Sequence, residues 1–405
     1  MIRRELYLKQ LYGYIDKPFI KVITGIRRSG KSVLLMLLKK ELLIRGVEEK
    51  NIIYINFESF EFSEITSAQL LYHYVKERIN SGKRYYLLFD EIQEVEDWEK
   101  AINSFRVDFN TDIYITGSNS RLLSGELATY LAGRYIELPV YTLSFKEYLL
   151  FQKEYSRDVR HDRYRHFENY LRLGGFPAIH TGNYQEETAY KIVQDIYSSA
   201  ILRDAVQRNR IRDIELLERV VKYVFNNIGN KFSAKNVADY FKSQNRKLDL
   251  NTVYNYLNAL EAAFIVHRIQ RYNIKGKEIL KTNEKYFIGD QSLLYALMGY
   301  KDQLISGVLE NIVMLELKRR GFNVYVGKLD NTEIDFIAEK TNQKIYVQVS
   351  YKMTEKSTID REYKPLLAIR DNYPKNVITM DKTWSDTIEG IRHYHIADFL
   401  MLDSY

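Results

Sequence analysis

The chain has 405 residues and a net charge of +7, with 45% hydrophobic residues, 28% charged residues and no cysteine. This length exceeds one ordinary hydrophobic core and predicts two or three domains, while the missing cysteines exclude disulfides, iron–sulfur clusters and thiolate zinc sites. The N-terminus is followed by no apolar stretch, and nowhere do 18 uncharged apolar residues run together. We therefore expect no signal peptide, no membrane span and a cytoplasmic protein.

A nucleotide-binding loop is predicted near the N-terminus. Residues 19–24 form an apolar segment typical of a short buried strand, and residues 32–40 carry apolar side chains at helical spacing. The motif G-I-R-R-S-G-K-S lies between them. In such a loop, backbone N–H groups and the helix N-terminus surround phosphates, Lys31 reaches the β- and γ-phosphate oxygens, and the Ser32 hydroxyl binds Mg²⁺. The expected ATP-binding residues are Gly25, Ile26, Arg27, Arg28, Ser29, Gly30, Lys31, Ser32 and Val33.

The second half of the expected site is the apolar segment Y-Y-L-L-F followed by two carboxylates, Asp90 and Glu91. Asp90 is expected to hold Mg²⁺, and Glu91 is expected to orient and polarise the water that attacks the γ-phosphate. The alternative interpretation is that two acidic residues after a strand are only the solvated start of a loop.

Two further apolar segments, at residues 51–57 and 112–117, complete the pattern of a doubly wound parallel sheet with polar side chains at the strand ends. With these motifs the chain resembles AAA+ ATPases, in particular a prokaryotic family with an N-terminal AAA domain and a C-terminal domain of unknown function of the DUF4143 type. The resemblance implies that Ser118 or Asn119 senses the γ-phosphate and that Asn56 restrains the catalytic glutamate. Helix caps or turn residues are the alternative interpretation of all three.

The segment L-A-G-R at residues 131–134, directly before a fifth expected strand at residues 135–138, also resembles this family. The resemblance implies that Arg134 supplies positive charge to a γ-phosphate, either in its own site or across a subunit boundary. Arg27 and Arg28 are additional candidates for this role. Each of the three arginines has the alternative interpretation of a surface cation.

Residues 141–207 have a helical pattern interrupted by L-G-G-F-P, and they resemble the small lid that AAA+ proteins place over the nucleotide. We assign no chemistry to this segment.

The positive charge is concentrated in residues 208–281, which hold 15 lysine or arginine residues against 7 acidic ones. Three predicted helices followed by a hairpin with the turn N-I-K-G-K-E are typical of a winged helix. On the third helix Asn251, Asn255 and Asn258 fall on the face opposite the apolar stripe, where asparagines can contact bases, and Lys275 and Lys277 in the turn can hold phosphate. Double-stranded DNA is the expected partner, with a protein contact as the alternative.

The last part of the chain resembles the family's final domain, whose α/β core is similar to PD-(D/E)xK nucleases. The matching residues are Glu310, Glu333, Asp335, Gln348 and Ser350. A working metal nuclease needs a carboxylate and a lysine where Gln348 and Ser350 stand. Lys352 is a candidate for a migrated lysine, but Gln348 still removes a metal ligand, so we expect a degenerate nuclease-like domain.

Taken in chain order, the sequence predicts an α/β P-loop AAA+ core at residues 1–140, a helical lid at 141–207, a winged helix at 208–290 and a nuclease-like α/β domain at 291–405. The expected activity is Mg²⁺-dependent ATP hydrolysis whose nucleotide state controls DNA engagement. A nucleotide switch that recruits a protein partner, and a Mg²⁺-dependent DNA nuclease, are the alternatives. Whether the protein forms a homo-oligomer is left open.

Overall fold

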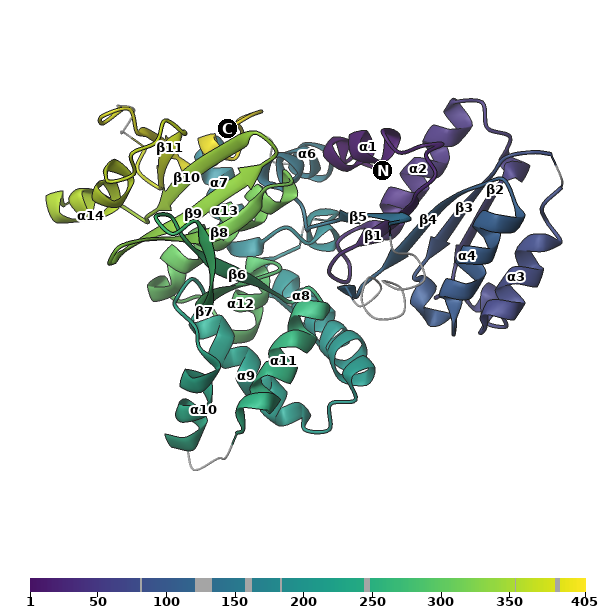
Figure 1. Cartoon of the computed structure of the whole chain (residues 1–405), viewed down its shortest axis with the longest axis horizontal. Coiled ribbons are helices and arrows are strands. Elements are labelled where there is room, and N and C mark those ends of the chain that lie inside the picture. The colour runs from purple at the N-terminus through teal and green to yellow at the C-terminus, as the bar shows by residue number, and fades with distance from the viewer. Residues whose placement is uncertain are drawn as a thin grey trace. The chain divides into compact units, whose positions relative to one another are not determined.

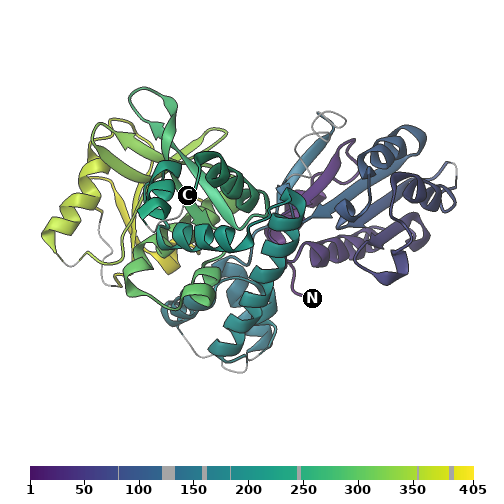
Figure 2. The same cartoon turned by 90° about the horizontal axis from the view of Figure 1, so that it is seen from below.

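The computed structural model describes residues 1–80, 82–120, 133–156, 162–182, 184–243, 248–353, 355–382 and 387–405 (Figures 1 and 2). The chain divides into two compact units. The first consists of Met1–Val140 with Ala262–Phe264, and the second of Tyr141–Glu261 with Ile265–Tyr405. In the described part of the chain, no helix has the length and apolar character needed to cross a membrane.

The first unit is built on a five-stranded parallel sheet in the order β2-β3-β4-β1-β5. All five predicted strands are present, and the order confirms the predicted doubly wound α/β core. The strands are β1 (Ile20–Thr24), β2 (Ile52–Asn56), β3 (Tyr85–Asp90), β4 (Thr111–Gly117) and β5 (Tyr135–Pro139).

Helices cover both faces of this sheet, as a buried parallel sheet requires. Leu34 and Leu38 of α2 pack in one core cluster with residues of α1. Leu71 and Phe105, from α3 and α4, pack in another on the opposite face. Val33, within the expected apolar stretch, is instead exposed. The helices are α1 (Glu5–Tyr12), α2 (Lys31–Ile44), α3 (Ala68–Lys76) and α4 (Trp98–Asp108), with short 3₁₀ turns at Glu49–Asn51, Phe60–Phe62 and Ile92–Glu94.

The second unit contains a seven-stranded mixed sheet in the order β12-β11-β10-β9-β8-β6-β7. Its strands are β6 (Val266–Asn273), β7 (Glu278–Ile288), β8 (Asn323–Leu329), β9 (Thr332–Lys340), β10 (Gln343–Val349), β11 (Lys375–Thr379) and β12 (Arg392–His395). Its helices are α6 (Phe145–Tyr155), α7 (Arg163–Leu173), α8 (Glu186–Ser199), a π-helical continuation (Ala200–Gln207), α9 (Ile214–Asn226), α10 (Ala234–Ser243), α11 (Leu250–Ala262), α12 (Gln291–Met298), α13 (Ile305–Arg319), α14 (Lys356–Leu367) and α15 (Ile396–Phe399), with 3₁₀ turns at Pro177–His180 and Asp302–Leu304.

The hairpin β6–β7, predicted as the wing of a separate winged helix, instead belongs to this sheet. The three helices α9 to α11 and the two strands lie where the sequence predicted them. However, β6 pairs in parallel with β8 through Arg271 and Val326, so the hairpin forms one end of the seven-stranded sheet. The predicted boundary between residues 290 and 291 therefore cuts through a single sheet, because the pairing partner of β6 lies about fifty residues further along the chain.

The helices predicted as a nucleotide lid pack within the second unit, where α7 and α8 contact α12. The G-G-F-P turn explains this packing. Gly174 has a φ of 72°, and a Cβ at Gly175 would lie 2.4 Å from the Leu143 carbonyl oxygen, so both positions favour glycine. The buried Asp290 carboxylate accepts hydrogen bonds from the Gly175 N–H (2.8 Å) and from the Ser292 N–H (2.9 Å) and hydroxyl (2.5 Å), which joins the turn to the start of α12.

We expect Asp290→Ala to lower the thermal stability of the second unit. Removing the carboxylate leaves buried N–H donors without an acceptor, a loss of about 2–5 kcal/mol, which corresponds to roughly 5–15 °C in the unfolding midpoint of a domain of this size. Differential scanning calorimetry of the full chain measures it. The control is Asp239→Ala, an exposed aspartate on α10. Equal midpoints in the two variants would show that Asp290 does not hold the turn.

Candidate functional site

The predicted phosphate-binding loop connects the end of β1 to the start of α2, and two glycines shape it. Gly25 has a φ of 145°, and a Cβ there would lie 2.1 Å from the Val140 carbonyl oxygen, so no other residue fits beside the end of β5. Gly30 has a φ of 99° and precedes the first residue of α2. The loop thus presents backbone N–H groups and a helix N-terminus at the carboxyl edge of the sheet, which is the arrangement that binds phosphate.

Lys31 is the first residue of α2 and is almost completely buried, with 3% of its surface exposed. Its Nζ atom donates to the Gly25 carbonyl at 3.0 Å and to the Ile26 carbonyl at 3.4 Å. The same atom lies 3.6 Å from Glu91 Oε1. The predicted loop lysine and the predicted catalytic glutamate therefore face each other at the end of the sheet.

Asp90 is the last residue of β3 and is fully buried. Its carboxylate accepts hydrogen bonds from the Thr116 hydroxyl at 2.6 Å and the Tyr54 hydroxyl at 3.3 Å. Burial raises the pKa of Asp90, and hydrogen bonds from the Thr116 and Ser32 hydroxyls oppose the rise. Ser32 and Asp90 thus place two hard oxygen ligands side by side, a donor set that fits the predicted Mg²⁺.

Thr116 was missed by the sequence analysis. Its hydroxyl donates to Asp90 and also accepts from the Glu91 N–H at 2.9 Å, so one side chain of β4 fixes both acidic residues. The signal was its position near the end of a predicted strand, directly before Gly117. Ser118 and Asn119, the expected phosphate sensors, are buried at the same edge of the sheet.

Glu91 is held by a different amide from the one expected. Its backbone adopts a left-handed conformation with a φ of 54°, uncommon for a residue with a side chain. The Gln93 side-chain amide donates a hydrogen bond to Glu91 Oε2. Asn56, the expected partner, uses its Oδ1 atom to accept from the Glu58 N–H at 2.9 Å. In this structure Gln93, and not Asn56, is therefore the side-chain amide that restrains the glutamate.

Arg134 lies at the opposite edge of the sheet from the phosphate-binding loop. Its carbonyl accepts from the N–H of Ile20 at the start of β1, whereas the loop follows Thr24, roughly 13 Å further along the strand. Its guanidinium donates to Asn103 Oδ1 at 3.3 Å. This position does not allow Arg134 to reach a nucleotide in its own loop. The first two residues of the L-A-G-R motif lie outside the described residues.

Three other arginines lie in the loop or beside it. Arg27 donates to Glu58 at 2.7 Å, and Arg28 is exposed with a left-handed φ of 65°. Arg4 was not predicted as part of the site. It is 3% exposed, and its guanidinium donates to the Ser29 carbonyl at 2.8 Å. The N-terminal segment therefore helps to fix the conformation of the loop.

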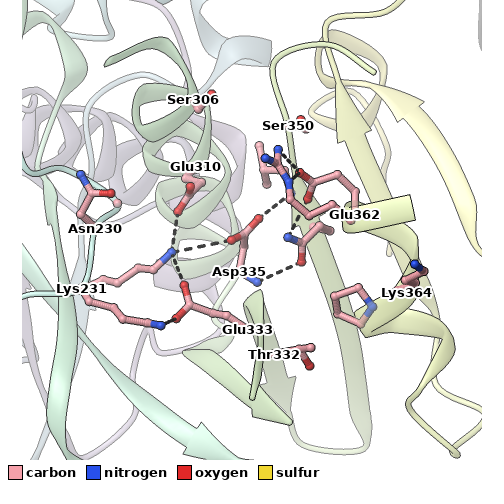
Figure 3. A pocket seen from close by; sticks show the side chains of 16 residues that line it. Asn230, Lys231, Ser306, Glu310, Thr332, Glu333, Asp335, Ser350, Glu362 and Lys364 are labelled. Atoms are coloured by element: carbon pink, nitrogen blue, oxygen red, sulfur yellow. Dashed lines mark hydrogen bonds and ion pairs between the residues drawn. The ribbon is translucent and has the colours of Figure 1, made fainter. Parts of the chain in front are cut away.

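In the second unit, the residues of the expected degenerate nuclease site do lie together, around a cavity of about 840 Å³ (Figure 3). Glu310 comes from α13, Glu333 and Asp335 from β9, and Gln348 from the end of β10, with Ser350 directly after that strand. The Gln348 side chain donates to Glu362 Oε2 at 2.8 Å, and its amide oxygen accepts from the Asp335 N–H at 3.3 Å. The amide is therefore fixed by protein partners on both of its ends.

A lysine that the sequence analysis missed occupies the centre of the acidic cluster. Lys285 of β7 places its Nζ atom 3.1 Å from Glu310 Oε2, 3.0 Å from Glu333 Oε1 and 3.7 Å from Asp335 Oδ1. Lys352, the expected migrated lysine, is exposed and does not line the cavity. Among the residues that the structure describes, no group of three or more histidines and acids has the geometry to hold a metal ion.

Burial dominates the titration of this cluster. It raises the pKa of Glu310 to about 8, with a further rise from Asp335 and an opposing effect of Lys285. Burial also raises the pKa of Asp335 to about 6, again opposed by Lys285. Burial alone lowers the pKa of Lys285, but the three carboxylates outweigh it and raise that pKa above its usual range. Lys285 thus stays charged in the cluster, and burial favours the protonated form of Glu310.

The residues expected to contact DNA lie on the surface of the second unit. Asn251, Asn255 and Asn258 are exposed along α11. Val253, Leu257 and Leu260 of the same helix are buried, which confirms the predicted division of the helix into two faces. In the β6–β7 turn, Lys275 pairs with Asp330 at 2.6 Å, while Lys277 is exposed.

The sheet order, the glycine-bounded loop and the paired acids define a P-loop fold of the AAA+ type, and residues 17–149 match the model of an AAA domain. The chain is 42% identical over 402 residues to an uncharacterized protein of Haemophilus influenzae, covering 99% of both chains. It is 32% identical over 408 residues to an uncharacterized protein of Methanocaldococcus jannaschii, covering 98% of this chain and 88% of the other. The chain belongs to one family with these two proteins.

A second family model, a domain of unknown function named DUF8612, matches residues 164–304. This match replaces the expected DUF4143 type, and it spans helices α7 to α12 together with the β6–β7 hairpin. Among solved structures, the chain is similar to a Walker-type ATPase of Pyrococcus abyssi, with 16% identity, 73% of this chain and 95% of the other covered, and a TM-score of 0.49. It is also similar to AMPPCP-bound DnaA of Aquifex aeolicus, with 15% identity, 64% and 86% covered, and a TM-score of 0.31.

The raised pKa of Glu310 predicts a pH dependence of stability. A carboxyl whose folded pKa of about 8 exceeds the ordinary value of 4.5 stabilises the fold fully below pH 4.5, and the contribution is lost as the pH rises toward 8. In Glu310→Gln the side chain is neutral at every pH. We therefore expect the unfolding midpoint of the wild type to fall relative to that of Glu310→Gln between pH 5 and pH 8, measured by calorimetry. Parallel pH profiles would show that Glu310 ionises normally in the folded protein.

Proposed function

We propose that this protein binds Mg·ATP in the loop Gly25–Ser32 and hydrolyses it. The observation that carries the proposal is the convergence of Lys31, Ser32, Asp90 and Glu91 at the carboxyl edge of β1 and β3. Lys31 would bind phosphate, Ser32 and Asp90 would bind the metal, and Glu91 would orient water. These are the groups that phosphoryl transfer to water requires.

The contacts of Lys31 indicate what changes when nucleotide binds. Its ammonium is held by two loop carbonyls and faces Glu91, so it must exchange these partners for the β- and γ-phosphate oxygens. Ser32 and Asp90 would hold Mg²⁺, which would neutralise charge on the phosphates. Glu91, held by the Gln93 amide, would accept a hydrogen bond from the attacking water.

Arg134 is suited to a neighbouring subunit's nucleotide rather than its own. It lies at the sheet edge away from the loop, and its side chain is exposed. A homo-oligomer in which Arg134 completes an adjacent site is the arrangement that gives this residue a catalytic role. The same geometry makes action within its own subunit unsuitable.

Control of DNA engagement is the proposed output of the nucleotide cycle. Three asparagines on the exposed face of α11 and the excess of basic residues in segment 208–281 support DNA as the partner. A protein partner is the second candidate. The nuclease alternative loses support, because the Gln348 amide is fixed by Glu362 and Asp335, and Lys285 fills the space among the carboxylates.

We expect Lys31→Ala to lose ATP binding and hydrolysis, because it removes the phosphate-binding cation. Glu91→Gln is expected to bind ATP with unchanged affinity but to lower kcat by a factor of about 100 or more, because only water positioning is lost. Phosphate release measures turnover, and equilibrium binding of a fluorescent ATP analogue measures affinity.

The matched control is Lys40→Ala, an exposed lysine on the same helix as Lys31. It is expected to hydrolyse ATP like the wild type. Turnover at the wild-type rate in purified Glu91→Gln would remove Glu91 from the mechanism, and turnover retained in Lys31→Ala would place hydrolysis elsewhere in the chain.

A further inference from the structure

The charged side chains that line the cavity of the second unit divide into a buried group and an exposed group. Its floor consists of Lys285, Glu310 and Asp335, whose side chains are only 4%, 12% and 10% exposed. Its mouth carries Lys231, Arg361 and Lys364, whose side chains are 56%, 72% and 74% exposed. A molecule approaching from solvent therefore meets cations first, and the carboxylates lie beneath them.

The negative charge of the floor is partly offset by cations of the protein itself. Lys285 contacts three carboxylates at 3.0–3.7 Å, and Lys231 lies 3.3 Å from Glu333 Oε2. The remaining acid of the lining, Glu362, accepts hydrogen bonds from Gln348 and from Arg361. The lining thus holds four acidic and four basic side chains, and three of the basic side chains are the exposed cations of the mouth.

Uncommitted hydrogen-bond donors add to these cations. Ser350 is 6% exposed and lines the cavity, and within the described part of the chain no protein group hydrogen bonds to its hydroxyl. Ser306, in the first turn of the fifteen-residue helix α13, and Asn230 also line the cavity and are exposed. Hydroxyl and amide donors beside lysine and arginine are the groups that contact phosphate and sugar oxygens in nucleic-acid complexes.

We propose that this cavity binds the phosphodiester backbone of DNA without a divalent metal, and that Lys285 provides the positive charge that a metal would otherwise provide. The inference rests on the proposed DNA engagement and names a second contact surface for it, apart from the asparagine face of α11. A cationic ligand does not suit the cavity, because Lys285 already occupies the space among the carboxylates. An anionic backbone suits it, because the mouth is lined by exposed lysine and arginine side chains.

The test uses the full chain and a fluorescein-labelled 20-nucleotide duplex, titrated in EDTA over a series of salt concentrations. The wild type is expected to bind, with affinity falling steeply as salt rises. In Lys231→Glu/Lys364→Glu the affinity is expected to drop at least tenfold. The slope of log affinity against log salt concentration is expected to decrease by the equivalent of about two phosphate contacts. Lys153→Glu/Lys40→Glu is the control for net charge, since both lysines are exposed and neither lines the cavity, and it should bind like the wild type.

A second variant tests the role of Lys285 itself. Lys285→Met leaves the carboxylates without their internal cation, so DNA binding should weaken in EDTA and recover when Mg²⁺ is added. Wild-type binding should be the same with EDTA and with Mg²⁺. Circular dichroism checks that Lys285→Met is folded. If Lys285→Met does not fold, the result for Lys231→Glu/Lys364→Glu, which alters only exposed side chains, decides the inference.

Two results would overturn the inference and leave the proposed function standing. One is wild-type binding that disappears in EDTA. The other is binding that the mouth variant retains but that Asn251→Ala/Asn255→Ala/Asn258→Ala loses. If the wild type binds no DNA even at low salt, both this inference and the proposed DNA engagement are wrong, while the ATPase proposal is tested separately by Lys31→Ala and Glu91→Gln.

Discussion

The contact between a buried ammonium and the carbonyls of its own loop is the interaction on which the nucleotide site depends. Lys31 cannot be solvated by water, so the carbonyls of Gly25 and Ile26 and the Glu91 carboxylate take the place of its hydration shell. The loop keeps this shape because Gly25 fits against Val140 and because Arg4 holds the Ser29 carbonyl. Phosphate oxygens can therefore replace partners around an ammonium that is already in position.

The Thr116 hydroxyl fixes the positions of both acidic residues, Asp90 and Glu91. Thr116 donates to the side chain of Asp90 and accepts from the backbone N–H of Glu91, so one hydroxyl links the proposed metal ligand to the proposed water-orienting residue. Catalytic groups work well when neighbouring hydrogen bonds fix their positions in this way. Gln93 restrains the Glu91 carboxylate from the other side, from within the short 3₁₀ turn that follows it.

The features that could be predicted from the sequence were those encoded by a few neighbouring residues. The loop, the two acids and the five strands were recognised because a motif or an apolar run of a few residues encodes each of them. Arg4, Thr116 and Lys285 were missed because their roles come from tertiary contacts with residues 25 to 50 positions away. For the same reason the hairpin was placed correctly but assigned to the wrong domain: β8, which pairs with β6, lies far along the chain. Segment 229–232 shows this most clearly, since Lys231 forms a β-bridge with Lys285 and brings the mouth and the floor of the cavity together.

The most direct test of the nucleotide site is a crystal structure of the protein with Mg²⁺ and a non-hydrolysable ATP analogue. We expect the phosphates in the loop Gly25–Ser32, with Lys31 Nζ moved from the Gly25 and Ile26 carbonyls onto the β- and γ-phosphate oxygens and Glu91 facing the γ-phosphate. At a saturating concentration of the analogue, a loop that holds no nucleotide and a Lys31 still bonded to the Gly25 carbonyl would contradict the proposed ATPase site.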